Sequence, residues 1–563
     1  MSASSDGVVR DQDAAWGDEW DAVVDVIVVG SGAAGGAAAA TAAGAGASVL
    51  VLEKAAFTGG TTAKSGGVMW VPDNPVMRAA GVRDDRAGAL RYLARTGHPT
   101  QYDPDHETLG LPATTYRQLE AFFDHGCAVL DRLTELGAWE LEAVPYPDYY
   151  ADLPEDLVPI GRVIQPTFPP GWRRGIDPTG GQLLTDALLR VAVEQGAAMR
   201  TDTRVAHLVR DDAGRVIGVE ARAGVRTVLY GAHNGVIFAS GGFLHDRALA
   251  RAHLRGPVMG GAAAESATGD FVRIGIEVGT QLGNMSHAWW DQVAVEHALT
   301  VPSTIKDVWS PFGASMLMVD KYGHRVVNEK AVYNERGQVH FVWDPSRYEY
   351  PNLLLFWILD QAVLDDPTAS RFRWPLPMPG EPLPDFVFSA PTVTALADEL
   401  RRRLARLAPR TGGVALADDF DAALAATVER FNGYARAGHD PEFHRGESQI
   451  ERTWAGEPRP GLPNAALAPL ADEGPYYCVI LGPGALDTKG GPEIDEHGRV
   501  LGVDGKPILG LYGAGNCIAS PAGQAYWGPG GTIGPAIVFG AIAAEHAVAA
   551  GARRPPEMRQ AAR

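Results

Sequence analysis

The sequence predicts an α/β protein with more than one domain, and three observations support this prediction. The chain has 563 residues, which is too long for one simple core and indicates roughly two to four domains. Glycines cluster at residues 30–36, 59–67 and 528–534, where the backbone is expected to turn sharply or to approach a ligand closely. The region from about 288 to 465 is richer in aromatic and charged residues and includes a helical pattern at 395–408, which indicates a domain of different architecture.

The first glycine cluster lies in a strand–turn–helix–strand unit. Residues 26–29 form a β-branched run typical of a buried parallel strand. An alanine-rich helix is expected over 33–43, and a second strand over 48–52. The turn carries a G-x-G-x-x-G pattern at Gly30, Gly32 and Gly35, and Glu53 follows the second strand. This context favours a Rossmann-like dinucleotide site over a glycine-rich turn in an ordinary βαβ unit.

The chemistry of such a turn is direct. Its glycines let a pyrophosphate reach the helix N-terminus, where unpaired N–H groups and the helix dipole favour negative charge. The carboxylate of Glu53 is expected to accept hydrogen bonds from ribose hydroxyls. A second loop of small residues at 57–74, and strand-plus-glycine segments at 235–243 and 507–516, indicate a cofactor held along its whole length. This arrangement favours FAD over an exchanging NAD.

Composition excludes several other classes of protein. The 49 basic and 68 acidic residues give a net charge of −19, which leaves no basic excess for nucleic acid. Cys127, Cys478 and Cys517 match no metal-ligand spacing, so no metal is expected. The N-terminus lacks the regions of a signal peptide, and Glu545 and His546 interrupt the longest apolar run. We therefore expect a cytoplasmic protein without an integral membrane segment.

Several motifs together carry a recognisable likeness. They are DVIVVGSGAAG, EKAAFTGGTTAKSGG, ASGGF, TGD at 268–270, RVVNE at 325–329, LYGAGN and GGTIGPAIVFGAIAA. From Asp25 to about Ala550 the chain resembles the flavoproteins of the fumarate reductase/succinate dehydrogenase superfamily and, within it, the 3-ketosteroid dehydrogenases. The resemblance implies a discontinuous Rossmann-like FAD-binding domain with an inserted α+β cap or catalytic domain.

The expected domain boundaries follow from this likeness. Residues 21–287 and 466–551 form the two parts of the FAD-binding domain, 288–465 form the cap, and 1–20 and 552–563 are tails. Because no histidine lies beside the cofactor segments in a form that suggests a covalent link, FAD is expected to be non-covalent. The residues expected to contact FAD are Gly30, Gly32, Ala33, Ala34, Gly35, Glu53, Lys54, Gly60, Thr61, Thr62, Ser65, Gly66, Gly67, Ala239, Ser240, Gly241, Gly515, Asn516, Thr532 and Ile533.

The catalytic prediction begins in the cap, in the stretch NEKAVYNERG. Fumarate-reducing relatives carry asparagine–glutamate, three intervening residues, and then an arginine that protonates the alkene. Here the matching position is Tyr333, as in the ketosteroid dehydrogenases. A phenol with a pKa of about 10 is able to act as a base when helped, so the resemblance implies that Tyr333 removes a proton beside a carbonyl. Arg336, three residues on, stays open as a rival proton donor.

A second tyrosine precedes the last glycine cluster. The resemblance implies that the Tyr526 hydroxyl and the Gly530 N–H bind the substrate's ketone oxygen, which makes an oxyanion hole for the developing enolate. The glycines are expected there because a Cβ would keep the carbonyl away from the amide. A third phenol, Tyr149 or Tyr150, is expected to assist Tyr333, and Tyr150 is the one we assign. Trp527 is expected to shape the substrate cavity, and Gly528 favours a Δ1-type enzyme over a Δ4-type enzyme.

The resulting hypothesis is an FAD-dependent desaturation of a 3-ketosteroid or similar cyclic ketone. Tyr333 takes the α-proton, flavin N5 takes the β-hydrogen as hydride, and an external acceptor reoxidises the flavin. The alternative is an ene-reductase of the fumarate reductase type that reduces an activated C=C bond, with Arg336 as the acid.

Overall fold

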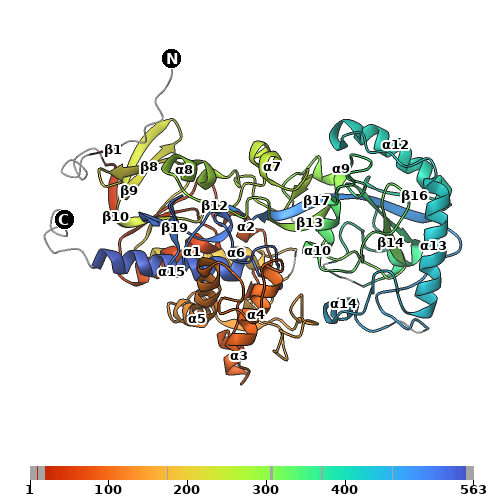
Figure 1. Ribbon diagram of the computed structural model, residues 1–563, viewed down its shortest axis with the longest axis horizontal. Helices are drawn as coiled ribbons and strands as arrows, with labels where there is room; N and C mark the ends of the chain where they lie inside the picture. Colours follow the sequence, from red (N-terminus) through yellow and green to blue (C-terminus); the bar gives the residue numbers. More distant parts are fainter. Residues whose placement is uncertain are drawn as a thin grey trace, which may run out of the picture. The chain divides into compact units, whose positions relative to one another are not determined.

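The protein is described from a computed structural model, which describes residues 9–10, 20–173, 175–304, 308–368, 370, 372–458 and 461–552. The chain divides into two compact units. Unit 1 comprises Met1–Leu254, Ala263–Ala288 and Asp487–Arg563, and unit 2 comprises Arg255–Ala262 and Trp289–Leu486. Each unit has its own principal sheet (Figure 1).

The sheet of unit 1 is built on parallel strands. Strand β2 (Ala22–Val29) lies between β3 (Val49–Leu52) and β10 (Arg226–Phe238), and β7 (Ala198–Arg200) pairs with β3. Residues 26–29 and 49–52 are buried throughout, as expected for parallel strands covered on both faces. The late strand β20 (Pro507–Gly513) pairs in parallel with β10. The chain therefore leaves this sheet and returns to it, which confirms a discontinuous α/β domain.

Small residues let two helices of unit 1 approach closely. Helix α1 (Ala33–Gly44) contains only glycine, alanine and one threonine, and it packs against α15 (Ile533–Ala552). A Cβ on Gly540 of α15 would lie 2.4 Å from the carbonyl oxygen of Ala34, so this contact requires glycine. Among the described residues, α15 is the one helix long and apolar enough to cross a membrane. Of the apolar stretch that meets this criterion, 72% is buried. Burial of this kind is also found in the core helix of a globular domain.

The remaining elements of unit 1 include three strands that extend the same sheet. The helices are α2 (Gly60–Ala63), α3 (Pro75–Ala79), α4 (Arg86–Gly97), α5 (Ala113–Glu135), α6 (Gly180–Glu194), α7 (Arg247–His253) and α8 (Asp270–Val278). The strands are β4 (Met69–Trp70), β5 (Leu141–Ala143), β6 (Val163–Pro166), β8 (Thr203–Asp211), β9 (Val216–Ala223), β12 (Leu282–Gly283), β18 (Gly491–Pro492) and β19 (Arg499–Leu501). Strand β8 pairs with β9, β9 with β10, and β19 with β20. Strands β4, β6 and β5 form a separate small sheet.

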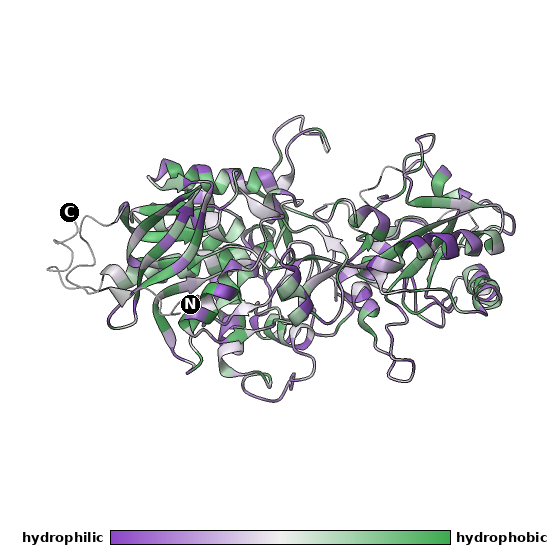
Figure 2. Ribbon diagram, turned by 90° about the horizontal axis from the view of Figure 1, so that it is seen from above, coloured by the Kyte–Doolittle hydropathy of each residue, from purple (hydrophilic) through white to green (hydrophobic). Residues whose placement is uncertain are grey.

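The sheet of unit 2 is largely antiparallel and is covered on both faces. Its long strand β17 (Tyr476–Thr488) pairs with β15 (Leu355–Asp360) and β16 (Val387–Ala390), and β14 (Met316–Val319) pairs with β15. Alternate residues of these strands enter two different hydrophobic clusters, as the two-residue period of a strand requires. One cluster includes apolar residues of α12 (Val393–Thr411) and α13 (Phe420–Ala437). Figure 2 colours each residue by hydropathy, and green, the colour of hydrophobic residues, recurs along the strands.

Unit 2 also contains several short elements. They are β11 (Gly260–Gly261), β13 (Ala288–Ala294), α9 (Val295–Ala298), α10 (Tyr333–Gly337), α11 (Gln361–Asp365) and α14 (Gln449–Ala455).

The unit boundaries differ from those expected from the sequence. The expected change of domain at residue 465 falls before β17, yet residues 476–481 of β17 pair with β15, and the division lies at Leu486. Residues 255–262 also belong to unit 2, because β11 pairs with β17. The apolar run of β17 predicts a strand, but the run alone does not indicate which sheet the strand joins.

Candidate active site

The turn after β2 contains glycines for two different structural reasons: some are required by the packing of the chain, and one leaves space for a ligand. Gly30 has φ of +105°, and an added Cβ would lie 2.4 Å from the Ala239 carbonyl oxygen. A Cβ on Gly35 would lie 2.0 Å from the Gly30 carbonyl oxygen. The packing of the chain itself therefore requires these two glycines. A Cβ on Gly32 would meet its nearest atom, Thr62 Oγ1, at an ordinary 3.5 Å, so the space beside Gly32 is left for a ligand.

The N-terminus of α1 offers hydrogen-bond donors in the same place. The Ala33 N–H donates to Thr62 Oγ1 at 3.2 Å, and the Gly36 N–H already bonds within the helix. Within the described residues, the N–H groups of Ala34 and Gly35 make no hydrogen bond. Two unpaired donors at a helix N-terminus form an anion site, and they fit the pyrophosphate of a dinucleotide.

Glu53 and Lys54 lie at the end of β3, as predicted. The Glu53 carboxylate accepts hydrogen bonds from the N–H and the hydroxyl of Ser31, at 3.1 and 2.7 Å, and from the Ala55 N–H at 2.9 Å. These bonds fix the acid against the glycine turn. The Lys54 ammonium is paired with Asp270 at 2.8 Å. Lys54 therefore ties β3 to the start of α8.

The loop around α2 completes this region, which we call the cradle (residues 30–35 and 59–67). Ser65 donates to the Thr62 carbonyl at 2.7 Å and accepts from the Gly67 N–H at 3.1 Å, so its hydroxyl stabilises the loop. A Cβ on Gly67 would lie 2.2 Å from the backbone of Gly180. A Cβ on Gly60 or on Gly66 would meet no atom of the described chain within 4 Å. These two glycines therefore leave room beside the loop.

The other predicted cofactor residues are brought together from distant parts of unit 1. The buried Asp487 carboxylate accepts from the Gly242 N–H at 2.9 Å and from Asn516 Nδ2 at 3.2 Å. It thus joins the segment after β10, which contains residues 239–241, to the segment after β20, which contains Gly515. Thr532 and Ile533 lie at the start of α15. All residues that the sequence assigns to FAD lie in unit 1.

Tyr526 lies beside the two tyrosines of the PDYY segment. The Tyr526 N–H donates to the Tyr150 hydroxyl at 3.1 Å, and the rings of Tyr526 and Tyr149 lie 5.5 Å apart. The Tyr149 N–H donates to the Trp527 carbonyl at 2.9 Å. Both members of the tyrosine pair therefore contact the Tyr526 segment.

Gly530 has a backbone conformation that excludes a side chain. Its φ is +89°, and an added Cβ would lie 2.5 Å from the Val68 carbonyl oxygen. The neighbouring strand, rather than a substrate, thus accounts for the glycine, which corrects the reason expected from the sequence. The Gly530 carbonyl accepts from the N–H groups of Trp70 and Gly534, whereas its N–H makes no hydrogen bond within the described residues.

Trp527 is a core residue, so the expectation that it shapes a substrate cavity is wrong. Its side chain is fully buried, and its ring lies 5.2 Å from that of Trp70 and 5.8 Å from that of Phe122. Its Nε1 donates to Thr96 Oγ1 at 3.0 Å. Adjacency to Tyr526 in the sequence did not indicate that the indole faces the interior.

In unit 2, Tyr333 begins α10, and Arg336 lies on the same short helix. The Arg336 guanidinium is fully buried, and burial lowers its pKa to about 10. It donates to Gln292 Oε1 at 2.6 Å and to the carbonyls of Ala331 and Val308. Arg336 therefore anchors α10 within unit 2.

Sequence reasoning missed two groups of polar residues. In unit 2, Gln292 also bonds the His340 ring at 2.9 Å, and burial lowers the pKa of His340 to about 4. In unit 1, the buried Asp148 carboxylate accepts hydrogen bonds from Trp70 and Arg162. The available signal was the presence of polar residues within apolar stretches of the sequence. Their spacing matches no known motif, so the sequence did not indicate that they meet in the fold.

The fold and the cradle define the class of a dinucleotide-binding α/β protein, and comparison with known proteins specifies it. The family model described as FAD binding domain matches residues 25–533, so the chain belongs to this family of FAD-dependent oxidoreductases. The chain is 31% identical to 4-oxocyclohexanecarboxylate 2-dehydrogenase of Sinomonas cyclohexanicum, with 92% of each chain covered. It is 32% identical to 3-oxosteroid 1-dehydrogenase of Mycolicibacterium smegmatis, with 92% of this chain and 96% of that protein covered.

A solved structure gives the same result. The 3-ketosteroid Δ1-dehydrogenase of Sterolibacterium denitrificans, in complex with 1,4-androstadiene-3,17-dione, superimposes with a TM-score of 0.75 at 27% identity, covering 94% of this chain and 99% of that one. The resemblance inferred from the motifs is therefore confirmed. FAD is the cofactor, and the enzyme is a dehydrogenase of the type that acts on CH–CH bonds.

Proposed function

We propose that this enzyme introduces a double bond beside the carbonyl of a six-membered ring ketone, either a 3-ketosteroid or a smaller cyclic ketone. The observation that carries the proposal is the Gly530 N–H, which has no partner within the described residues, in the same loop as Tyr526. One of the two relatives above is named for an oxocyclohexane substrate and the other for an oxosteroid. Both names describe a ketone on a ring.

In the proposed reaction, the Tyr526 hydroxyl and the Gly530 N–H donate hydrogen bonds to the ketone oxygen. Their bonds strengthen as the α-proton leaves and negative charge collects on that oxygen. Tyr333 takes the α-proton on its phenolate oxygen. Bound FAD supplies the two-electron acceptor for the hydrogen that leaves the β-carbon, and an external acceptor takes the electrons onward. Tyr150, whose hydroxyl holds the Tyr526 N–H, keeps Tyr526 in place.

The contacts of Arg336 favour this direction over the ene-reductase alternative. An alkene-protonating arginine must present a free N–H to the substrate. Here Nε bonds Gln292, Nη1 bonds the Ala331 carbonyl, and Nη2 bonds the carbonyls of Val308 and Trp309. The guanidinium is thus occupied in holding unit 2 together.

The proposal is tested with a substrate panel. Saturated and Δ4 3-ketosteroids and 4-oxocyclohexanecarboxylate are incubated with the enzyme and a dye acceptor, and the mass and double-bond position of each product are determined. We expect a product two hydrogens lighter, with the new bond next to the carbonyl. Oxidation of the photoreduced enzyme by enones, without dye reduction by any ketone, would instead support the ene-reductase.

Two variants test the assigned residues. Tyr526→Phe and Tyr333→Phe are each expected to keep bound FAD and to lose turnover, for Tyr526 by roughly a hundredfold to a thousandfold. Tyr434→Phe is the control, because among the described residues its hydroxyl bonds only Glu442, at an exposed position of unit 2. Wild-type turnover in either of the first two variants contradicts the role assigned to that tyrosine.

A further inference from the structure

A buried arginine in unit 1 packs on Trp70, and the Trp70 ring packs on that of Trp527, next to Tyr526. Arg162 is completely buried, and three carboxylates surround it. Its Nε lies 2.5 Å from Asp84, and its Nη1 lies 2.5 Å from Asp148 and 2.9 Å from Asp156. One guanidinium cannot neutralise three carboxylates, and burying charge costs more than well-packed apolar side chains would. Stability alone therefore does not account for this cluster.

The cluster is connected to Gly530 through Trp70. The Trp70 indole N–H donates to Asp148 Oδ1 at 2.9 Å, and the same oxygen accepts from the Arg162 N–H at 2.9 Å. The backbone N–H of Trp70 donates to the Gly530 carbonyl at 3.2 Å. One residue thus joins the Asp148 carboxylate to the backbone of the proposed oxyanion hole.

The cluster is connected to Tyr526 by a second route. Asp148 directly precedes Tyr149 and Tyr150 in the sequence. The Tyr149 N–H bonds the Trp527 carbonyl at 2.9 Å, and the Tyr150 hydroxyl accepts the Tyr526 N–H at 3.1 Å. The two residues after Asp148 therefore hold the chain on both sides of the bond between Tyr526 and Trp527.

We propose that Asp148, anchored by Arg162, and Trp70 are positioning residues that set the spacing between the Tyr526 hydroxyl and the Gly530 N–H. The inference rests on the proposed function, because in that function the two donors bind the same ketone oxygen. Donor pairs of this kind must be held within about 0.5 Å of the productive geometry. The two routes that start at Asp148 supply that constraint from outside the loop.

The structure offers a matched pair of variants for the test. Asp148 and Asp156 both contact Nη1 of Arg162, and their side chains are 0% and 3% exposed. Only Asp148 bonds Trp70. Asp148→Asn is expected to keep FAD and nearly the wild-type KM but to lose kcat by roughly tenfold to a hundredfold, as when an orienting partner behind a reacting group is removed. Asp156→Asn is expected to keep kcat, although both variants lower Tm.

A binding measurement separates positioning from general loosening. A phenol with the ring skeleton of the best substrate presents a planar oxygen, as the enolate does, and its dissociation constant is read from the absorbance of bound FAD. Asp148→Asn should weaken this phenol more than it weakens the ketone, while Asp156→Asn should leave both unchanged. Equal effects of the two variants on kcat and on phenol binding overturn the positioning role.

Further outcomes keep the inference distinct from the proposed function. If Tyr526→Phe keeps wild-type turnover, the proposed function fails and this inference fails with it. If Tyr526→Phe loses turnover while Asp148→Asn matches Asp156→Asn, only the positioning role is overturned. If Asp148→Asn does not fold, Trp70→Phe decides, since it removes the indole donor and keeps an aromatic ring in the packed core. A loss of kcat with unchanged KM then supports the inference, and unchanged kcat overturns it.

Discussion

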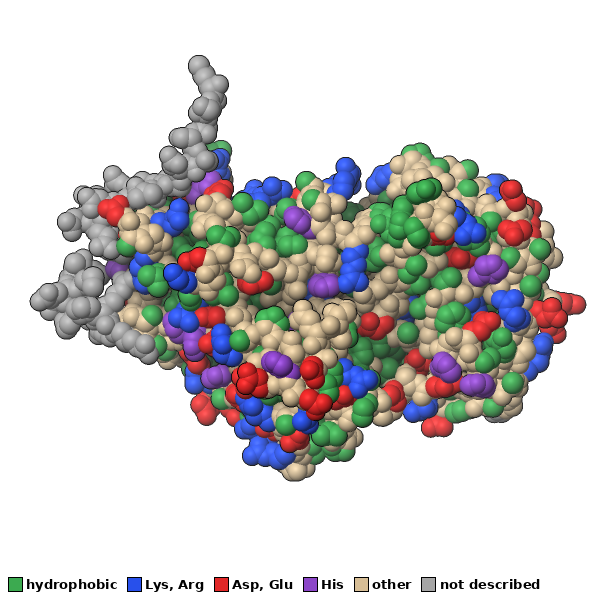
Figure 3. All heavy atoms as spheres, in the orientation of Figure 1, with side chains coloured by type: hydrophobic (Ala, Val, Ile, Leu, Met, Phe, Trp, Pro, Cys, Tyr) green, Lys and Arg blue, Asp and Glu red, His purple; other side chains and the backbone are tan. Residues whose placement is uncertain are grey.

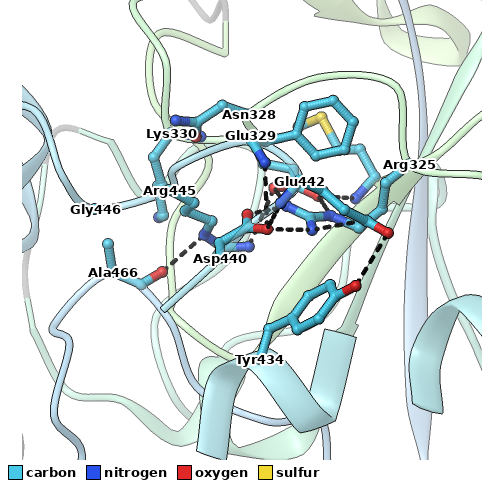
Figure 4. Close-up of polar contacts among 12 residues, drawn as sticks. Arg325, Asn328, Glu329, Lys330, Tyr434, Asp440, Glu442, Arg445, Gly446 and Ala466 are labelled. Carbon is cyan, nitrogen blue, oxygen red and sulfur yellow. Dashed lines mark hydrogen bonds and ion pairs between the residues drawn. The ribbon is translucent and has the colours of Figure 1, made fainter. Parts of the chain in front are cut away.

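The cradle of unit 1 and the chain leading to Tyr333 in unit 2 are held by opposite means. In unit 1 the cradle is made by missing side chains and by backbone N–H groups, as at Gly32 and Ala34. In unit 2 the chain leading to Tyr333 is held by buried charge. Figure 4 shows Glu329, four residues before Tyr333, among Arg325, Asp440 and Arg445.

The geometry of the unit 2 cluster is that of a closed network. Arg325 contacts both oxygens of Glu329, at 2.8 and 2.9 Å, and Asp440 at 2.7 Å. Arg445 lies 3.4 Å from Glu329 and donates to the carbonyls of Met316 and Ala466. Burial alone would raise the pKa of Glu329, but Arg325 and Arg445 lower it below its ordinary value. Glu329 therefore stays ionised in the interior.

The difference shows which kind of site a sequence reveals. A backbone site is local, since Gly30, Gly32 and Gly35 belong to one turn. A charge network joins residues that are far apart in the chain, such as Glu329 and Arg445, and it is defined only after folding. The comparison predicts that unit 2 depends on individual charges and that the cradle depends on individual glycines.

The largest expected effect is in the unit 2 network. Glu329→Gln removes the carboxylate that Arg325 and Arg445 share. Arg445 then loses this partner, whereas Asp440 still pairs with Arg325. We expect a loss of about 3–5 kcal/mol in the free energy of unfolding, measured by urea denaturation with unit 2 unfolding first. Glu447→Gln is the control, because the Glu447 side chain is 44% exposed and its ion-pair partners within the described residues are the surface histidines His439 and His444. Similar losses of unfolding free energy in both variants would contradict the view that burial makes the Glu329 charge important for stability.

The second prediction concerns a buried carboxyl that lacks such compensation. Asp291, on β13, is fully buried, and its Oδ2 has no hydrogen-bond partner within the described residues. Burial raises its pKa to about 7, although Arg336 lowers it. For an acid with a raised pKa in the folded state, the stability contribution is present below pH 4 and is lost as the pH rises through 7.

This sign is tested by comparing the wild type with Asp291→Asn. Between pH 5 and pH 7 the wild type should lose on the order of 2 kcal/mol in unfolding free energy relative to the variant. Urea denaturation at three pH values measures the difference. A difference that is constant across this range would mean that the charge of Asp291 is already compensated, as that of Glu329 is.

The third prediction tests the cradle with two alanine substitutions. A Cβ on Gly35 would lie 2.0 Å from the Gly30 carbonyl, so Gly35→Ala should destabilise the protein by about 1–3 kcal/mol. A Cβ on Gly32 meets the chain only at 3.5 Å, so Gly32→Ala should fold with nearly unchanged apoprotein stability. Its FAD affinity, measured by fluorescence titration of the apoprotein, should nevertheless fall. Unchanged FAD affinity would remove Gly32 from the cradle.

The sequence singled out the local parts of the candidate site and missed the parts assembled by folding. The glycine turn, Glu53 and the motif position of Tyr526 each lie within one short segment, so pattern and chemistry were sufficient to single them out. Trp527 was misassigned because sequence adjacency does not say which way a side chain points. Arg162 and Asp148 were missed because their contacts join loops and strands that are separate in the chain. The end of unit 2 was misplaced because β17 joins a sheet whose other strands lie far earlier in the sequence.

The smallest expected effect belongs to charges on the surface. Basic and acidic side chains are interspersed on the face seen in Figure 3. On α6, Arg190 and Glu194 are paired at 2.8 Å, with side chains 48% and 55% exposed. Because water solvates both groups and salt screens them, Glu194→Gln should change the free energy of unfolding by less than about 0.5 kcal/mol. Urea denaturation at low and high salt measures this change. A loss as large as that of Glu329→Gln would show that burial does not decide the contribution of a charge, and the contrast between the two units would then have another cause.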